Sequence, residues 1–231
     1  MTVSKVAVVT GAASGIGACV VAELQSRGWK VAGLDLKPTG ADLNIECDVS
    51  DFESVKKARD LVIKELGVAS AVASVAGHYE IIPVVEITEQ KWQRMLHVHL
   101  GGAFNLAQVF LPDMVAQKSG AFVAVTSELA IGGGDQDSHY AAAKGGIIGL
   151  VRSLAIEMAP HGVRINAVAP GPTDTPLLTS DSPWRAPDYL ATLPIRRLAS
   201  PEEIALTAAF LIEDATFLVG EIISPNSGAV I

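Results

Sequence analysis

Tyr140 and Lys144 are the two residues whose types and spacing best suit proton-transfer chemistry. They lie four positions apart in a segment whose neighbours predict a helix, and on a helix this spacing places two side chains on one face, about 5–6 Å apart at Cβ. A nearby ammonium group makes a phenol easier to ionise. A phenol, which titrates near about 10, needs that help to exchange protons at neutral pH. For the pair alone, an amphipathic tyrosine beside a solvated lysine is the alternative interpretation.

The elements that must position this pair alternate between strand and helix. Strand patterns lie at 6–10, 30–35, 70–75, 121–126 and 163–168, with a short last strand at 220–224. Helical patterns lie at about 16–26, 51–66, 89–116, 139–158 and 200–211. This alternation predicts an α/β fold with a doubly wound parallel sheet. Because no linker or repeat divides the chain, we expect a single domain over residues 1–231.

Two helix starts and one long loop add detail to this expectation. We expect Ser50 to cap the helix at 51–66, and Ser200-Pro201-Glu-Glu to open the helix at 200–211. The stretch at about 170–199 has no periodicity and contains six prolines. A loop of that length inside a compact domain is usually a lid or a binding loop, so we predict a substrate loop there.

Composition excludes several classes of partner. The net charge is −8 and no cluster of lysine and arginine occurs, which argues against nucleic acid and anionic membranes. Only 18% of the residues are charged while 49% are hydrophobic, which suggests that some apolar surface is hidden between subunits. We therefore expect a globular protein that forms a homo-oligomer.

The two cysteines and the N-terminus indicate the compartment. Cys19 and Cys47 do not form a Cys-x-x-Cys motif, so we expect buried free thiols in a reducing compartment and no metal site. The N-terminal segment lacks the features of a signal peptide, and no apolar run reaches the length of a membrane span. These observations predict a cytoplasmic protein.

A glycine-rich turn joins the first predicted strand to the first predicted helix. Gly11 permits a tight turn, Gly15 allows the backbone to approach a pyrophosphate, and Gly17 allows close packing of helix on strand. A phosphate there faces the free N–H groups of the helix. A strand before and a helix after these glycines is the context that indicates a dinucleotide site; a tight turn without a ligand is the alternative.

Asp35 at the end of the second predicted strand selects between the two nicotinamide cofactors. It lies 18 positions after Gly17, near the offset of about 20 at which an acid binds the adenosine ribose. A carboxylate accepts hydrogen bonds from ribose hydroxyls and repels a 2′-phosphate. Lys37 is the only cation nearby. We therefore expect NAD and not NADP.

Over nearly its whole length the chain resembles the short-chain dehydrogenase/reductase family, which implies a Rossmann fold. Five spaced motifs, in the order in which the family has them, carry the resemblance. They are Thr10-Gly11-x-x-x-Gly15-x-Gly17, Asp48-Val49, Ser127 at 13 positions before Tyr140, Tyr140-x-x-x-Lys144, and Pro170-Gly171-x-Thr173-x-Thr175.

The resemblance implies a mechanism. Tyr140 is the general acid in ketone reduction and the general base in alcohol oxidation, and Ser127 donates a hydrogen bond to the substrate oxygen. Lys144 binds the nicotinamide ribose and, with the positive nicotinamide ring, lowers the pKa of Tyr140. The residues expected to bind NAD are Gly11, Ser14, Gly15, Ile16, Gly17, Asp35, Asp48, Val49, Ala76, Gly77, Tyr140, Lys144, Pro170, Gly171, Thr173 and Thr175.

The sequence departs from the family pattern at several places. Ser74-Val75-Ala76-Gly77 replaces Asn-Asn-Ala-Gly, and His99 stands where the family usually has an asparagine whose backbone carbonyl holds a water in a proton relay. His99 is therefore a candidate catalytic residue, with a satisfied core histidine as the alternative. Asp35 and Asp48 are too close for a full helix between the second and third strands. Ser224-Pro-Asn-Ser-Gly228 replaces Val-Asp-Gly-Gly in a segment commonly packed between subunits, where the resemblance implies a tetramer or a dimer.

The expected function is hydride transfer between NAD(H) and a secondary alcohol or ketone. Candidate substrates are a cyclic alcohol or dihydrodiol, a hydroxy acid, or a 3-oxoacyl thioester. One alternative is an NAD-binding sensor without turnover; another is a sugar-nucleotide epimerase or dehydratase, which normally needs a larger C-terminal region. Candidate substrate contacts, each with a surface aromatic or a solvated charge as the alternative, are His78, Tyr79, Glu128, His139 and Trp184.

Overall fold

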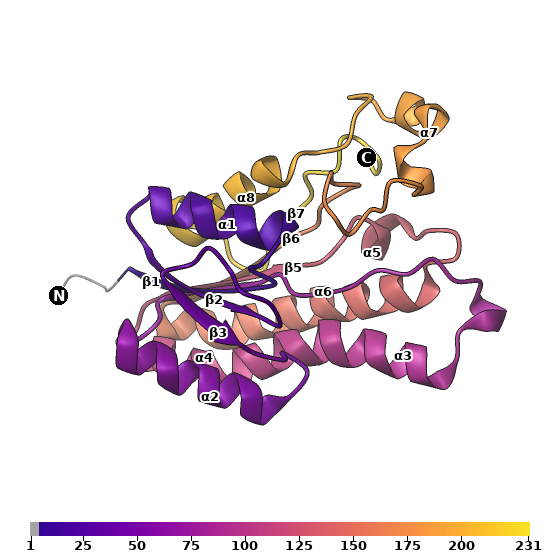
Figure 1. Cartoon of the computed structure of the whole chain (residues 1–231). Coiled ribbons are helices and arrows are strands. Elements are labelled where there is room, and N and C mark those ends of the chain that lie inside the picture. Colours follow the sequence, from indigo (N-terminus) through magenta and orange to yellow (C-terminus); the bar gives the residue numbers. More distant parts are fainter. Residues whose placement is uncertain (1–4) are drawn as a thin grey trace.

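The computed structural model describes residues 5–231 and contains a seven-stranded parallel sheet with the order β3-β2-β1-β4-β5-β6-β7 (Figure 1). The order reverses between β1 and β4, and in such sheets ligands bind beyond the carboxyl ends of the strands at this switch point. The strands are β1 (Val6–Thr10), β2 (Lys30–Asp35), β3 (Leu43–Glu46), β4 (Ala71–Ser74), β5 (Gly120–Val125), β6 (Val163–Val168) and β7 (Ile222–Ile223).

Helices cover both faces of the sheet, as Figure 1 shows. One face packs against α2 (Phe52–Glu65), α4 (Gly102–Gln117) and α6 (Ser138–Met158). The other face packs against α1 (Gly15–Ser26) and α8 (Pro201–Ala209). Each layer buries its own apolar cluster against the sheet, which confirms the doubly wound α/β fold.

Most element boundaries agree with the sequence, and the exceptions have local causes. The strands at 30–35 and 163–168 lie where predicted, but the last strand is only Ile222–Ile223. The N-cap of α2 is Asp51, which accepts a hydrogen bond from the Glu53 N–H at 3.0 Å, so the prediction of Ser50 was wrong. Ser50 instead donates to Asp48 at 2.7 Å. Ser200 and Glu203 form the full capping box that opens α8.

The predicted helix at 89–116 is interrupted by a π-helical turn. It comprises α3 (Glu89–Leu96), the turn η2 (His97–Gly101) and α4. A Cβ on Gly102 would lie 2.8 Å from Cγ2 of Val49, so the glycine lets this turn approach the loop after β3. Single π turns of this kind are frequent at functional sites. A second π turn, η5 (Phe210–Asp214), follows α8 where the sequence predicted a plain helix end.

The loop at about 170–199 carries short elements of its own. It contains the 3₁₀ turn η4 (Pro183–Arg185) and α7 (Pro187–Thr192), and its ends meet in an isolated parallel bridge between Thr173 and Ala199. Three further short elements that the sequence did not predict are α5 (Leu129–Gly132) and the 3₁₀ turns η1 (Val84–Glu86) and η3 (Ala159–His161). Pro187 at the first position of α7 fits the preference of helix starts for proline.

Both cysteines are free thiols, but only Cys47 is buried. Cys19 is partly exposed on α1 and contacts Glu202 at 3.5 Å, so the expectation of burial was wrong for this residue. Among residues 5–231, none of the helices combines the length and apolarity that crossing a membrane requires. The prediction that the N-terminal segment is not a signal peptide falls partly on residues 1–4, which lie outside the described part.

Candidate active site at the carboxyl edge of the sheet

The glycine-rich turn leaves β1 and enters α1 in a conformation that favours glycine. Gly11 has φ of +64°, and a Cβ there would lie 2.9 Å from Cα of Ala76. A Cβ on Gly17 would overlap the carbonyl oxygen of Gly11. Ser14 is the N-cap of α1, but its side chain does not accept a capping hydrogen bond. The first N–H groups of α1 are therefore available to a phosphate, as a dinucleotide site requires.

Acidic residues stand at the end of β2 and just after β3. The Asp35 carboxylate accepts hydrogen bonds from the N–H groups of Ala13 and Lys37, each at 3.0 Å, so it is fixed beside the glycine turn. A carboxylate has lone pairs for further donors, which fits a ribose. Asp48 accepts a hydrogen bond from the Ser50 N–H. The side-chain amide of Asn105 donates to the carbonyl of the buried Val49 at 2.9 Å.

Thr10 connects the first strand to the Ala76-Gly77 segment. Its hydroxyl accepts the N–H groups of Val75 at 3.0 Å and Ala76 at 3.1 Å. This contact holds Ala76 and Gly77 against the glycine turn although the asparagines of the family pattern are missing. From sequence, Thr10 was named only as the first residue of the glycine motif; its position at the end of an apolar strand was the available signal for this contact.

The Pro170–Thr175 loop faces the glycine turn. A Cβ on Gly15 would lie 3.2 Å from the Thr175 side chain, so little space separates the two segments there. Thr173 donates to the Gly171 carbonyl at 2.8 Å, and a Cβ on Gly171 would lie 2.6 Å from Cα of Asn226. The segment after β7 therefore supports this loop from behind.

Ser127, Tyr140 and Lys144 converge between the end of β5 and the start of α6. Thr126 donates to the Lys144 carbonyl at 2.7 Å, which ties the strand end to the helix. Nζ of Lys144 donates to the Val125 carbonyl at 2.8 Å and lies 5.6 Å from the centre of the Tyr140 ring. All three side chains line one cleft that the Pro170–Thr175 loop also borders.

Burial dominates the electrostatics of this cleft. Burial raises the pKa of Tyr140 well above its usual value, and the Glu128 and Asp137 charges act in the same direction, while a hydrogen bond from Ser127 opposes them. Burial also lowers the pKa of Lys144 to about 7. A lysine that loses charge on burial attracts a phenolate weakly. The acidification of Tyr140, which the resemblance assigns to Lys144 together with the nicotinamide ring, stays a prediction.

Glu128 follows Ser127 and lines the same cleft. Its Oε2 accepts the Ser127 hydroxyl at 2.9 Å, and its side chain is buried. Burial raises the pKa of Glu128 to about 7, although hydrogen bonds from Ser127 and from backbone N–H groups act in the opposite direction. A carboxylate in this position is an acceptor aimed at the substrate space.

His99 lies in the η2 turn with its imidazole against the His78 backbone. Nε2 is 2.8 Å from the His78 carbonyl oxygen and 3.2 Å from its N–H nitrogen, and the ring is edge-on to Tyr140 with centroids 5.4 Å apart. One ring nitrogen either donates or accepts, so a given tautomer binds one of these two groups. Burial lowers the pKa of His99 well below its usual value, with the Lys144 charge adding to the effect.

The other candidate substrate contacts divide into two groups. Tyr79 and Trp184 line the cleft, and their side chains are linked, since Nε1 of Trp184 donates to the Tyr79 hydroxyl at 2.9 Å. That hydroxyl in turn donates to Asp137 at 2.7 Å. His78 and His139 are not among the lining residues, and His139 is buried. Sequence analysis missed Asp137; a lone carboxylate in a polar loop gave no signal.

Comparisons with known proteins agree with this geometry. A family model described as enoyl-(acyl carrier protein) reductase matches residues 11–229. The cis-4-hydroxycyclohexanecarboxylate dehydrogenase of Sinomonas cyclohexanicum is 39% identical, with 97% of this chain and 96% of the relative covered. A 3-oxoacyl-(acyl-carrier-protein) reductase of Thermotoga maritima is 31% identical, with 98% of each chain covered.

Solved structures share the fold across different named chemistries. The ligand-free aldohexose dehydrogenase of Thermoplasma acidophilum has a TM-score of 0.91 and 30% identity, covering 97% of this chain and 93% of that chain. A ribose-5-phosphate isomerase from Brucella melitensis 16M has a TM-score of 0.92 and 30% identity, covering 98% and 92%. Because one fold hosts several chemistries, the family is decided by sequence and motifs: the chain belongs to the short-chain dehydrogenase/reductase family of oxidoreductases.

Proposed function

We propose that this protein is an NAD-dependent oxidoreductase that interconverts a secondary alcohol and a ketone. The observation that carries this proposal is the convergence of Ser127, Tyr140 and Lys144 on one cleft with the Pro170–Thr175 loop. The 39% identical relative acts on a hydroxylated cyclohexane ring, which favours a cyclic alcohol among the candidate substrates. The substrate enters beneath the loop at about 170–199, which belongs to the same single domain.

NAD is the proposed cofactor, and the chain offers groups for each of its parts. The uncapped start of α1 suits the pyrophosphate, with Gly11, Ser14, Gly15, Ile16 and Gly17 forming the turn. Asp35 receives the adenosine ribose and repels a 2′-phosphate, while Asp48 and Val49 border the adenine. The nicotinamide half is received by Ala76, Gly77, Pro170, Gly171, Thr173 and Thr175. When bound, NAD accepts a hydride in alcohol oxidation and returns it in ketone reduction.

Three side chains handle the substrate oxygen and its proton. Tyr140 takes the hydroxyl proton in oxidation and returns it in reduction. Ser127, whose one hydroxyl proton is directed to Glu128 in the chain alone, turns it to the same oxygen and donates a hydrogen bond there. Lys144 binds the nicotinamide ribose. Because burial raises the pKa of Tyr140, deprotonation of the phenol depends on positive charge beside it, from Lys144 and from an oxidised nicotinamide ring.

A spectrophotometric panel of cyclic secondary alcohols, run with NAD and with NADP, tests the proposal. We expect turnover with NAD, and a loss of about 10²–10⁴-fold in the Tyr140→Phe variant, the usual contribution of general acid–base catalysis. Binding of NADH to this variant should remain. Tyr189→Phe is the matched control, because Tyr189 lies outside the lining of the cleft.

The results would separate the alternatives. Equal rates of Tyr140→Phe and wild type would refute the assigned role of the phenol. A preference for NADP would refute the role of Asp35. NADH binding without turnover of any alcohol would favour the sensor hypothesis, although the presence of Ser127, Tyr140 and Lys144 together argues against it.

A further inference from the structure

Glu128 occupies a position in the cleft that the proposed chemistry does not use. Its N–H donates to the Pro170 carbonyl at 3.1 Å, so its backbone is fixed between the end of β5 and the loop that receives the nicotinamide. Its side chain is only 6% exposed and lines the cleft beside Ser127 and Tyr140. A carboxylate is costly to bury without hydrogen-bond donors. In the chain alone the Ser127 hydroxyl and backbone N–H groups supply them, so a donor is missing once Ser127 turns to a substrate, and a ligand that replaces it is favoured.

The charges that line the cleft disfavour an anionic substrate group beside Glu128. Among the described residues that line the cleft, Glu128 and Lys144 are the charged ones, apart from the neutral His99. Nζ of Lys144 is already directed to the Val125 carbonyl. Within residues 5–231, no arginine or second lysine lines the space to bind a carboxylate or phosphate of the substrate. The lining therefore suits a neutral substrate with hydroxyl groups.

The contact between Glu128 and Ser127 fixes where such a hydroxyl would lie. Oε2 of Glu128 accepts the one hydroxyl proton of Ser127 across 2.9 Å. When that proton turns to the substrate oxygen, Glu128 loses this donor while its Oε2 stays next to Oγ of Ser127. Two atoms that hydrogen-bond to one hydroxyl oxygen are about 4–5 Å apart. A substrate can carry a second hydroxyl on the carbon next to the reacting carbon, gauche to the reacting hydroxyl. This second hydroxyl lies between the reacting oxygen and Oε2 of Glu128, and it can donate to the carboxylate.

We propose that Glu128 is a specificity-determining residue that selects substrates with a hydroxyl group on the carbon next to the reacting carbon, that is, 1,2-diols and the hydroxyketones formed from them. The selection operates through a hydrogen bond from that hydroxyl to the Glu128 carboxylate. This inference rests on the proposed alcohol oxidation. It also places diols above the other candidate substrates. The carboxylate of a 2-hydroxy acid is repelled by Glu128, and the carbonyl of a 3-oxoacyl thioester cannot donate a hydrogen bond to it.

The test compares matched substrates at pH 8.5, above the pKa of about 7 that burial gives Glu128. The ratio of kcat/KM for cyclohexane-1,2-diol to kcat/KM for cyclohexanol is measured with NAD in wild type and in Glu128→Met. We expect a wild-type ratio of at least about 10, the effect of one hydrogen bond to a charged group. The ratio should fall about tenfold or more in Glu128→Met.

A second variant gives a readout that structural damage would not produce. Glu128→Gln keeps an acceptor for Ser127 but removes the negative charge, so kcat/KM for 2-hydroxycyclohexanecarboxylate should rise at least about tenfold as repulsion is lost. The control is Glu80→Gln, a carboxylate paired with Lys91 outside the cleft, which should change neither quantity. An unchanged diol ratio in Glu128→Met, or no gain for the hydroxy acid in Glu128→Gln, would overturn the inference.

Failure of the proposed function would be visible separately. If wild type oxidises neither alcohol, the proposed activity is wrong. The role of Glu128 is then tested by calorimetric binding of the same diol and of cyclohexanol to the NADH-loaded protein. A preference for the diol that disappears in Glu128→Gln and Glu128→Met supports the role of Glu128. Equal binding of diol and monoalcohol to wild type contradicts it.

Discussion

Tyr140, Lys144 and Glu128 share one buried cleft, and burial shifts the pKa of each toward its neutral form. The direction differs with the sign of the charge, because desolvation penalises whichever form is charged. Tyr140 and Glu128 hold their protons more tightly, and Lys144 holds its proton less tightly. Sites of this kind lower stability in exchange for reactivity, which makes single substitutions informative.

Glu128→Gln should stabilise the protein at alkaline pH. The pKa of Glu128 is raised from 4.5 to about 7, so the stability that its proton provides is complete below about 4.5 and is lost as the pH rises through about 7. Glutamine does not ionise. We expect the variant to exceed wild type by up to about 3 kcal/mol in free energy of unfolding at pH 8.5, and by much less at pH 5. Urea denaturation at both pH values measures this, and a difference independent of pH would contradict it.

His99→Asn should retain activity. Asparagine has a separate donor and acceptor, so it can bind both the His78 carbonyl and the His78 N–H that Nε2 of His99 approaches at 2.8 and 3.2 Å. We expect turnover within a few-fold of wild type. His99→Leu, the control, leaves both backbone groups unpaired and should cost about 1–3 kcal/mol of stability. A hundredfold loss of turnover in His99→Asn alone would show that the imidazole itself takes part in catalysis.

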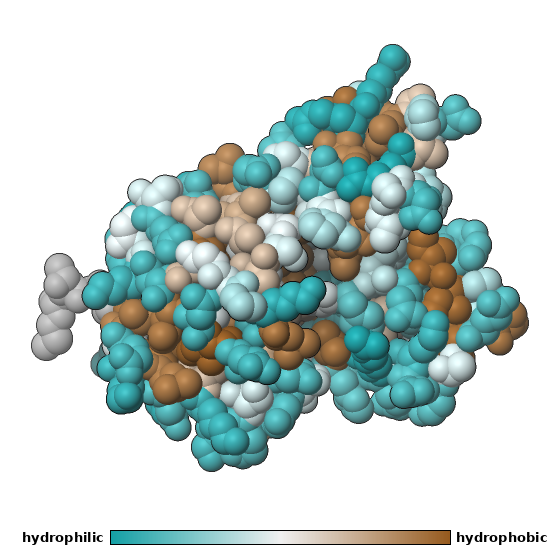
Figure 2. Space-filling view, in the orientation of Figure 1, coloured by the Kyte–Doolittle hydropathy of each residue, from teal (hydrophilic) through white to brown (hydrophobic). Residues whose placement is uncertain are grey.

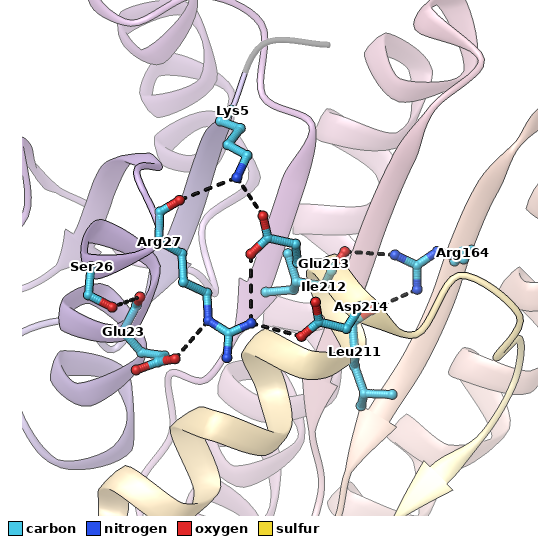
Figure 3. A network of polar contacts seen from close by, with 9 residues as sticks. All are labelled: Lys5, Glu23, Ser26, Arg27, Arg164, Leu211, Ile212, Glu213 and Asp214. Carbon is cyan, nitrogen blue, oxygen red and sulfur yellow. Dashed lines mark hydrogen bonds and ion pairs between the residues drawn. The ribbon is translucent and has the colours of Figure 1, made fainter. Parts of the chain in front are cut away.

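At the level of elements, the end of α8 depends on a side chain from a neighbouring strand. Figure 3 shows Arg164 of β6 directed at the η5 turn, where it donates to the carbonyls of Leu211 and Ile212, each at 2.7 Å. It also donates to the Ala215 carbonyl at 2.9 Å. Helix ends leave carbonyls without intrahelical partners, and this guanidinium binds three acceptors around one such end.

Arg164→Leu should therefore destabilise the protein by about 2–4 kcal/mol, since buried carbonyls lose charged hydrogen bonds. The stability of Arg164→Lys, which lacks the planar fork of donors, should lie between that of wild type and that of Arg164→Leu. The melting temperature and urea denaturation measure the effect. Arg27, which in Figure 3 pairs with Glu23 at 2.7 Å and Asp214 at 2.8 Å on the surface, is the comparison. Loss of this more exposed pairing should cost under about 1 kcal/mol for each pair. Equal losses in Arg27→Leu and Arg164→Leu would contradict the interpretation.

At the scale of the whole molecule, segments far apart in sequence enclose the cleft. Trp184 from the 170–199 loop donates to Tyr79, which donates to Asp137. The remaining surface is partly apolar: Figure 2 shows brown patches among teal ones on the face that is drawn. Ile156 on α6 is 80% exposed and Phe104 on α4 is 49% exposed. Apolar surface of this kind commonly marks subunit contacts, consistent with the proposed homo-oligomer.

Light scattering after size exclusion should show a dimer or a tetramer. Ile156→Glu should shift the protein toward smaller species, because a charge in an apolar interface is desolvated without a partner. Val85→Glu, at an 89% exposed residue in the η1 turn, is the matched control and should leave the mass unchanged. A monomeric wild type would contradict the oligomer, and an unchanged mass of Ile156→Glu would exclude this face as the interface.

The strands and motifs could be predicted because their signals are local. Val6–Thr10 is covered on both faces, so its apolar run identifies it directly. Val163–Val168 begins with the alternation of apolar and polar residues that is typical of a strand. β3, from Leu43 to Glu46, lies at the sheet edge with alternating exposure, and its short mixed sequence carries no such signal. The cap of α2 was misplaced by one residue because Ser50 and Asp51 both have capping chemistry.

The α/β class, the glycine turn and the Tyr140–Lys144 pair follow from the amino-acid sequence alone, since each depends on residues within one or two neighbouring elements. The environments of Glu128 and His99 depend on how distant segments pack. In sequence, Glu128 is an acid after a strand, which is usually solvated; here the Pro170 loop, α6 and the segment at 177–184 surround it. Burial depends on contacts between distant segments, and because burial sets the pKa and the available hydrogen-bond partners, it decides what a side chain of known type can do.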